Sequence, residues 1–263
     1  MPSFPGPKLA LIGAAVIAAF RPLPAAAAAD PRPAVAVAAA SNLVYALAAL
    51  DAGFLRANPN VNLTSMTGAS GSLVAQIRNG APYDVFLSAD LDFARKLIQG
   101  AGASAPSLRT FAFGRLVLWT TQPGLDLSSV EALVRNPAVQ KLAIANPDTA
   151  PYGLAAMQVL EKLHLQEAAR PKLVRGENIS QTAEFVETGN ADAGFVALSL
   201  VLSPKLKDRG HWQEVPAGWY APLGQAAVLT ARGAANPAAQ AYLNFLGSPA
   251  AGRILEQFGY RLP

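Results

Sequence analysis

Four short segments of this sequence combine small, amide and hydroxyl residues, and each lies between a strand-like apolar run and a helix-like segment. They are Ala40-Ser41-Asn42, Gly68-Ala69-Ser70-Gly71-Ser72, Ala150-Pro151-Tyr152-Gly153 and Glu177-Asn178-Ile179-Ser180-Gln181. The first turn of a helix leaves its backbone N–H groups without partners inside the helix, so each segment could face an anion. None of the four contains a lysine, and only the last has an arginine nearby, Arg175. Such residues are also ordinary helix caps, but four in one chain favour a binding site that holds a small oxyanion with uncharged dipoles.

Strand-like and helix-like segments alternate along the chain. We expect strands at 35–40, 61–66, 85–88, 116–120, 141–145, 173–174, 193–196 and 224–230. We expect helices at 43–55, 73–77, 90–98, 128–134, 154–163, 182–188, 237–246 and 250–258. This alternation predicts an α/β fold with mainly parallel sheets covered by helices on both faces.

The same pattern predicts two lobes. Residues 30–113 and 224–263 would form lobe I and residues 114–223 lobe II, with the chain crossing between them near Gly114 and returning near Leu223. Ligands of such sheets bind beyond the carboxyl ends of the strands. All four polar segments lie at that kind of position, two in each lobe, so we expect a ligand in the cleft between the lobes.

Residues 1–29 have the layout of a cleavable signal peptide. Lys8 precedes an apolar run from Leu9 to Phe20, and small residues follow from Ala25 to Ala29. The run is shorter than the roughly 20 residues that span a bilayer. We therefore predict an exported, periplasmic protein, with a retained anchor as the alternative. The chain has no cysteine, which excludes a thiolate metal site, a cysteine nucleophile and a lipoprotein anchor.

Composition and motifs argue against nucleic-acid binding and catalysis. The formal charge is +4 and the basic residues are scattered, so no basic stripe predicts a nucleic-acid partner. Ser70 lies in an incomplete nucleophile elbow, because Ser72 stands where the last glycine of Gly-x-Ser-x-Gly belongs. The two histidines, His164 at a helix end and His211 in a polar loop, are poor candidates for its base.

No metal or cofactor motif is evident. Two distant histidines without cysteines make no zinc site. Asp84, Asp90 and Asp92 could surround a hard cation, but aspartates at the end of a strand more often cap the following helix. We expect no free metal cation and no cofactor.

The four segments and several others carry a family resemblance. The chain resembles the periplasmic molybdate-binding proteins of ABC importers over essentially all of the sequence after residue 29. The matching pieces are 37–43, 68–73, 76–86, 88–90, 146–147, 150–153, 176–181, 194–197 and 258–260. The resemblance implies a two-lobed periplasmic-binding-protein type II fold, with the oxyanion held by uncharged donors in the cleft.

It also implies a set of ligand-binding residues. Ser41 and Asn42 would form the first contact region and Ala69 and Ser70 the second, while lobe II would contribute further contacts from Tyr152 and, through its backbone N–H, Ile179. Many members place a ligand-binding tyrosine shortly after the Phe-Val strand, where this chain has Ala197-Leu198, and carry serine at the position of Ala69.

The expected function is therefore capture of molybdate, and also tungstate, for delivery to the membrane permease of an ABC importer. The resemblance implies a monomer and no covalent chemistry. A sulfate or thiosulfate receptor is the alternative within the same class, and an exported Ser-dependent hydrolase is the alternative from another class.

Overall fold

The structure, a computed structural model, describes residues 1–3 and 32–263. The predicted signal peptide lies outside these residues except for its first three, so it stays a prediction. Residues 32–263 form one compact unit that contains two five-stranded sheets. None of the helices in the described part of the chain has both the length and the hydrophobicity to cross a bilayer.

The first sheet has the strand order β2-β1-β3-β10-β4. Its strands are β1 (Ala34–Ala40), β2 (Asn62–Gly68), β3 (Val85–Ser88), β4 (Arg109–Phe113) and β10 (Gly224–Leu229). β1 pairs in parallel with β2 and β3, whereas β10 is antiparallel to both β3 and β4. The carboxyl ends of β1, β2 and β3 consequently share one edge of the sheet.

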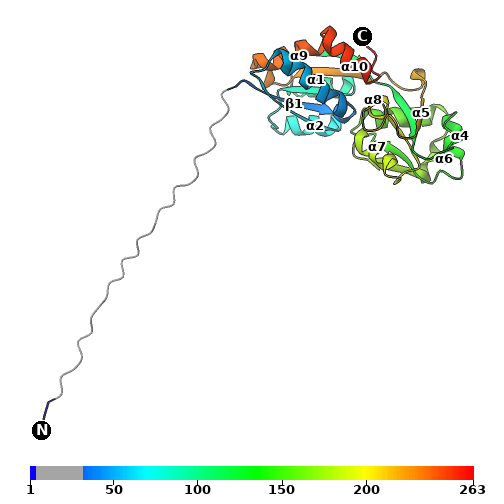
Figure 1. The fold of residues 1–263 in the computed structure, drawn as a ribbon, viewed down its shortest axis with the longest axis horizontal. Helices are drawn as coiled ribbons and strands as arrows, with labels where there is room; N and C mark the ends of the chain where they lie inside the picture. The colour runs from blue at the N-terminus through cyan, green and yellow to red at the C-terminus, as the bar shows by residue number, and fades with distance from the viewer. Residues whose placement is uncertain (4–31) are drawn as a thin grey trace. The chain divides into compact units, whose positions relative to one another are not determined.

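Helices cover both faces of this sheet. α1 (Val44–Ala57), α9 (Pro237–Leu246) and α10 (Pro249–Gln257) pack on one face, and α2 (Ser70–Arg78) and α3 (Leu91–Gln99) on the other. Figure 1 shows α1, α9 and α10 together on the side of the sheet opposite α2. Strand β10 serves both cores because its side chains alternate, with Ala227 and Leu229 in one and Ala226 and Val228 in the other.

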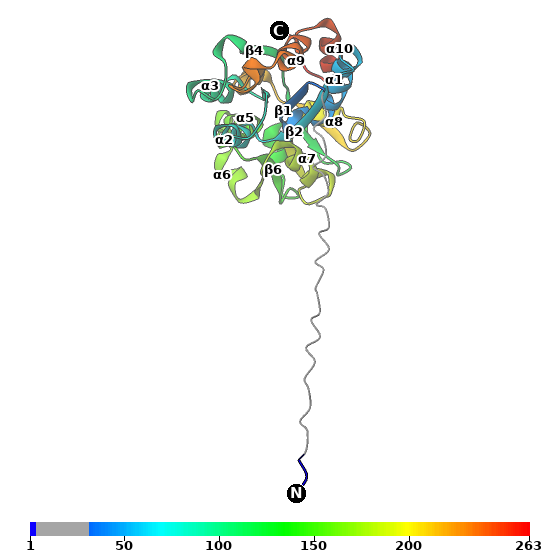
Figure 2. The ribbon, with the colours of Figure 1, turned by 90° about the vertical axis from the view of Figure 1, so that its left-hand side faces the viewer.

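The second sheet has the order β7-β6-β8-β5-β9. Its strands are β5 (Leu116–Thr120), β6 (Leu142–Ala145), β7 (Leu173–Gly176), β8 (Ala193–Ala197) and β9 (His211–Glu214). Its helices are α4 (Val130–Arg135), α5 (Pro151–Lys162), α6 (Gln166–Ala169), α7 (Ile179–Glu187) and α8 (Leu198–Val201). Figure 2 shows several of these helices around β6. β6 is parallel to β7 and β8, and β5 is antiparallel to β8 and β9.

The α/β, two-lobed fold expected from the sequence is therefore confirmed. We refer to the parts of the chain around the first and second sheets as lobe I and lobe II. Strands of the first sheet come from residues 34–113 and 224–229, and those of the second from residues 116–214. The exact lobe boundaries given above stay a prediction.

Two chain segments join the lobes, and they are bonded to each other. The backbone N–H of Gly114 donates to the carbonyl of Leu223 at 2.9 Å. Next to them, Arg115 Nε donates to Glu214 Oε1 at 2.7 Å. Phe113 and Arg261 exchange two backbone hydrogen bonds, so the last described residues of the chain also contact this crossing.

Two local expectations need correction and one is confirmed. His211 lies in the edge strand β9 rather than in a loop, and its Nε2 lies 2.8 Å from the carbonyl oxygen of Leu125. Asp90 does cap α3, accepting from the N–H of Phe93 at 2.9 Å. Asp84 is not a helix cap, because its Oδ2 accepts from the N–H of Ala36 in strand β1 at 2.8 Å.

Asp192 joins three loops of lobe II and provides a test of the fold. Its Oδ2 accepts from the N–H groups of Gln140 and Lys141, both at 2.8 Å, and its Oδ1 from Gln122 Nε2 at 2.7 Å. Burial acts to raise the pKa of Asp192, but these donors outweigh it and hold the pKa below its ordinary value. We predict that Asp192→Asn lowers the free energy of unfolding by about 1.5–3 kcal/mol at neutral pH.

The pH dependence of that difference follows from the direction of the shift. Because the folded pKa lies below the unfolded value of about 3.9, the stabilisation is present above that value and is lost as pH falls through the folded pKa. Urea unfolding at a series of pH values should therefore show wild type and variant converging in acid. Asp208→Asn, at an exposed carboxylate, should match wild type throughout, and a constant gap down to the lowest pH would contradict the account.

Candidate functional site

A small cavity lies where the carboxyl ends of strands β1 and β2 face the first turns of helices α5 and α7. All six residues predicted from the sequence line it, together with five neighbours; the complete lining is Ala40, Ser41, Asn42, Gly68, Ala69, Ser70, Ala89, Ala150, Pro151, Tyr152 and Ile179. The structure thus brings residues of all four polar segments to one place. That these residues bind a ligand stays a prediction.

Local backbone geometry sets the donors that face this cavity. At α7, Asn178 is the cap, and its Oδ1 accepts from the N–H groups of Ser180 at 3.0 Å and Gln181 at 3.1 Å. This leaves the N–H of Ile179, the first residue of the helix, without a partner among the described residues. Ala69 and Ala150 are the corresponding residues before α2 and α5, and neither has a side chain that can cap.

The two helices that lack a side-chain cap keep their first donors free. Within the described chain, the N–H groups of Ser70 and Tyr152 have no hydrogen-bond partner. The Ser70 hydroxyl oxygen accepts from the N–H of Ala89 at 3.1 Å, so the hydroxyl hydrogen remains available to donate. The cavity is therefore lined by backbone N–H groups and hydroxyls at helix N-termini, which attract negative charge.

No Asp, Glu, Lys, Arg or His is among the residues that line this cavity. Throughout residues 1–3 and 32–263, no group of three or more His, Cys, Asp and Glu side chains is arranged to hold a metal ion. No side chain that lines the cavity could thus neutralise the charge of a bound anion. An anion placed there would depend on hydrogen bonds from oriented dipoles.

The cavity is about 10 Å³ in volume, close to the minimum of roughly 10–15 Å³ that a single water molecule requires. A tetrahedral oxyanion has four oxygen atoms and needs more room. The walls must therefore separate to admit one.

Hydrogen bonds between the lobes surround the cavity. From lobe II, Ser180 Oγ donates to the carbonyl of Ser41 and Ser199 Oγ to the carbonyl of Asn42, both at 2.8 Å. On another side the N–H of Gly71 donates to the carbonyl of Thr149 at 2.9 Å. These contacts join the two lobes beside the cavity.

Tyr152 reaches from the cavity to the chain crossing. Its ring is fully buried, and a methyl group on Gly114 would lie only 2.1 Å from the phenol oxygen. The hydroxyl thus lies against the crossing segment, and the free donor that Tyr152 contributes at the first turn of α5 is its backbone N–H. Burial raises the pKa of Tyr152 well above its ordinary value, so the hydroxyl stays protonated.

Three buried polar residues behind the cavity were not predicted as site residues: Gln225, Tyr260 and Ser199. All three side chains hydrogen-bond to Asn42. Gln225 could have been noticed, because it is a lone amide in the apolar strand Gly224–Leu229. Tyr260 belongs to a segment that carries the family resemblance, but nothing in the sequence indicates that it contacts Asn42, which lies 218 positions earlier.

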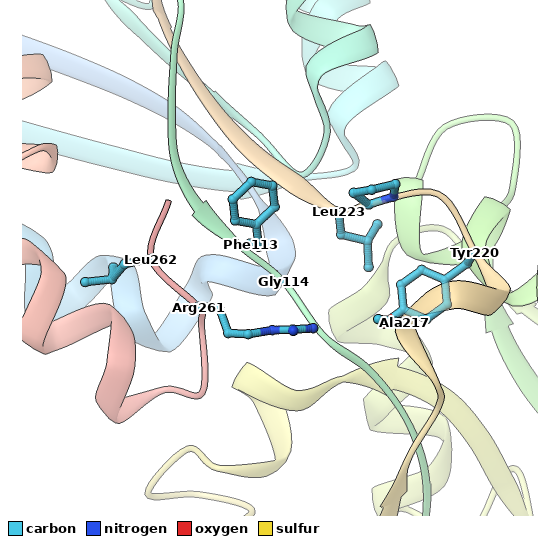
Figure 3. A pocket seen from close by; sticks show the side chains of 8 residues that line it. Phe113, Gly114, Ala217, Tyr220, Leu223, Arg261 and Leu262 are labelled. Carbon is cyan, nitrogen blue, oxygen red and sulfur yellow. The ribbon is translucent and has the colours of Figure 1, made fainter.

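A larger cavity, of about 330 Å³, lies at the chain crossing (Figure 3). Its walls are mainly apolar, formed by residues such as Phe113 and Leu223, with the guanidinium of Arg261 extending across it. Its lining includes neither the carboxyl end of a parallel strand nor the first turn of an α-helix. The smaller cavity, which has both, is therefore the candidate site.

Comparisons with known proteins identify the family of the chain. A family model described as bacterial extracellular solute-binding protein matches residues 35–261. The molybdate-binding protein ModA of Azotobacter vinelandii is 42% identical over 228 residues, covering 87% of this chain and 90% of that protein, and that of Rhodobacter capsulatus is 43% identical over 198 residues, covering 75% and 77%. The solved structure of the Azotobacter vinelandii periplasmic molybdate-binding protein superposes with a TM-score of 0.81 at 35% identity, covering 87% of this chain and 99% of that one.

The bonds between the lobes can be tested without any ligand. We predict that the double variant Ser180→Ala/Ser199→Ala shifts the protein toward an open form, because each hydroxyl stabilises closure by about 0.5–1.5 kcal/mol. Small-angle scattering should show a larger radius of gyration than in wild type. Thr188→Ala removes a hydroxyl that donates to the carbonyl of Glu184 and accepts from Asn190 Nδ2, both within lobe II, so it should leave the radius unchanged. An unchanged radius in the double variant would count against a role in closure.

Proposed function

The chain belongs to the bacterial extracellular solute-binding proteins, and on that basis we propose that it captures molybdate, and also tungstate, for an ABC importer. In this proposal it is exported to the periplasm through a cleavable signal peptide, binds the oxyanion as a monomer between its lobes, and delivers it to the membrane permease. It performs no covalent step and needs no cofactor.

The observation that carries the proposal is the convergence of uncharged donors on one cavity between the lobes. Ser41, Ser70, Tyr152 and Ile179 come from four separate segments and line the same space. Two relatives more than 40% identical are molybdate-binding proteins, and these donors suit a fully deprotonated dianion.

The physical basis is compensation of a buried charge by fixed dipoles. A dianion moved out of water needs hydrogen bonds on all its oxygens, and charge-assisted hydrogen bonds are the stronger kind. A ligand that contacts both lobes stabilises the closed form by the contacts that exist only in that form. Binding of the anion and closure of the lobes are then coupled in a single equilibrium.

Calorimetric titration tests the ligand directly. We predict that molybdate and tungstate bind tightly, that phosphate binds weakly or not at all, and that Ser70→Ala weakens molybdate binding by about 10–100-fold, the loss of one charge-assisted hydrogen bond of roughly 1.5–3 kcal/mol. Sulfate in the same series tests the alternative receptor class. Phosphate binding as tight as molybdate binding would overturn the proposal, and sulfate binding tighter than molybdate would favour a sulfate receptor.

The pH dependence of binding provides a second test. Because no Asp, Glu or His lines the cavity and burial keeps Tyr152 protonated, we predict that molybdate affinity is constant from about pH 6 to 8, the range in which a histidine would titrate. The measurement is the same titration at several pH values in one buffer system of constant ionic strength. A steep or bell-shaped dependence would mean that an ionisable group contacts the ligand.

A further inference from the structure

A buried amide of strand β10 sets the orientation of the Asn42 side chain. Gln225 is fully buried, and its Nε2 donates to the carbonyls of Leu223 at 2.9 Å and Ala89 at 3.1 Å. Carbonyl oxygens only accept hydrogen bonds, so the nitrogen of Gln225 must face them. Its Oε1 is then the atom that accepts from Asn42 Nδ2, at 2.7 Å.

Tyr260 makes two hydrogen bonds to Asn42, one with the side chain and one with the backbone. Its hydroxyl oxygen accepts from Asn42 Nδ2 at 2.8 Å, and its hydroxyl hydrogen is donated to the carbonyl of Asn42 at 3.0 Å. Burial raises the pKa of Tyr260, so the hydroxyl stays protonated and can both donate and accept. A single phenol thus restrains the side chain and the main chain of one residue of the cavity.

These bonds use both hydrogens of the Asn42 amide. The other atom of the amide, Oδ1, is an acceptor without a partner in the described residues. The side chain therefore has no hydrogen left to donate to an anion. Its bonds instead fix the short turn Ser41–Leu43, which connects strand β1 to helix α1 and places two residues in the wall of the cavity.

The backbone on either side of the Tyr260 phenol holds it in place. The N–H of Tyr260 donates to the carbonyl of Leu255 in helix α10 at 3.1 Å, and the next residue, Arg261, exchanges two hydrogen bonds with Phe113 at the chain crossing. The phenol also packs in the core of lobe I. Its position is consequently determined without the help of Asn42, so it can serve as a fixed support for the turn.

The bonds of the turn differ in whether they survive opening of the lobes. Ser180 and Ser199 belong to lobe II, so their bonds to the carbonyls of Ser41 and Asn42 are lost when the lobes separate. Tyr260 and Gln225 belong to lobe I together with the turn, and their bonds to Asn42 remain.

We propose that Tyr260 is a positioning residue, whose hydroxyl holds the turn Ser41–Leu43 in its binding conformation in the open form, before an anion arrives. Gln225 supports the same amide from strand β10. This inference rests on the proposed function, because the turn is positioned for the oxyanion of that proposal.

The consequence concerns the entropy of binding. A turn that is ordered before binding loses little freedom when the anion arrives, whereas a mobile turn must be ordered by the anion, at a cost in affinity. That cost does not depend on which anion is bound. Loss of the Tyr260 hydroxyl should therefore weaken every anion of the cavity by a similar factor.

Tyr260→Phe tests this directly, because it removes one oxygen atom and preserves the ring. In calorimetric titrations we expect the affinities for molybdate and tungstate to fall by the same factor, about three- to tenfold. Amide hydrogen exchange of the ligand-free variant should be faster than in wild type at the turn Ser41–Leu43, and molybdate should slow it again. Gln225→Met removes the other support of the amide and should change both measurements in the same direction.

Tyr242→Phe is the matched control that separates positioning from loss of stability. It also removes a buried phenol hydroxyl from lobe I, one that donates to Asp51 Oδ1 in helix α1 at 2.6 Å, and Tyr242 is not among the residues that line the cavity. Thermal unfolding should show a lower midpoint for both phenylalanine variants. Anion affinity and exchange at the turn should change only in Tyr260→Phe.

The outcomes distinguish the two proposals. The proposed function is judged from wild type alone, by whether molybdate binds, and if wild type binds sulfate instead, the same comparison is made with sulfate. If no anion binds, exchange at the turn in the ligand-free proteins still decides the role of Tyr260. Unchanged exchange at the turn in Tyr260→Phe, wild-type affinity in that variant, or an equal loss of affinity in Tyr242→Phe overturns the role.

Discussion

The arrangement of this molecule depends on burying the first turns of helices from two lobes against each other without any charged side chain. Unpaired N–H groups are costly to bury, and Ser70, Tyr152 and Ile179, whose N–H groups lack partners in the described residues, all line one cavity. The parallel pairing of β1 with β2 and of β6 with β7 places these helix starts at the facing edges of the two sheets. Without an anion, these unpaired donors raise the free energy of the closed form. With an anion bound, the same donors form hydrogen bonds and lower it, so the fold and anion binding depend on the same groups.

The sequence predicted eight of the ten strands, missing β4 and β9, and six of the residues that line the cavity, but it placed three helix starts too late. α2, α5 and α7 begin at Ser70, Pro151 and Ile179, whereas apolar periodicity suggested starts at residues 73, 154 and 182. The physical reason is the same in each case. The first turn faces the cavity, so it lacks the apolar side chains by which a buried helix face is recognised.

Other features could not be read from local patterns. Strand β9 is polar and exposed, and it is a strand because β5 pairs with it, as at Val117 and Glu214. Asp84 resembles a helix cap in sequence, yet it bonds to Ala36 in a neighbouring strand. The network of Asn42, Gln225 and Tyr260 joins residues from distant parts of the chain, and pairings of that kind depend on the completed topology. Six of the cavity residues were predicted because the four polar segments follow strands and the family resemblance selected these six within those segments.

The position of Tyr260 has a consequence for the order in which this protein can become functional. Its hydroxyl bonds to Asn42, and the next residue, Arg261, pairs with Phe113 at the crossing. A chain emerging from a membrane pore with its N-terminus first could form β1, β2 and most of lobe II before those residues arrive. The Asn42 amide would be held only after Tyr260 had arrived, so assembly of the candidate site would follow the formation of most of both sheets.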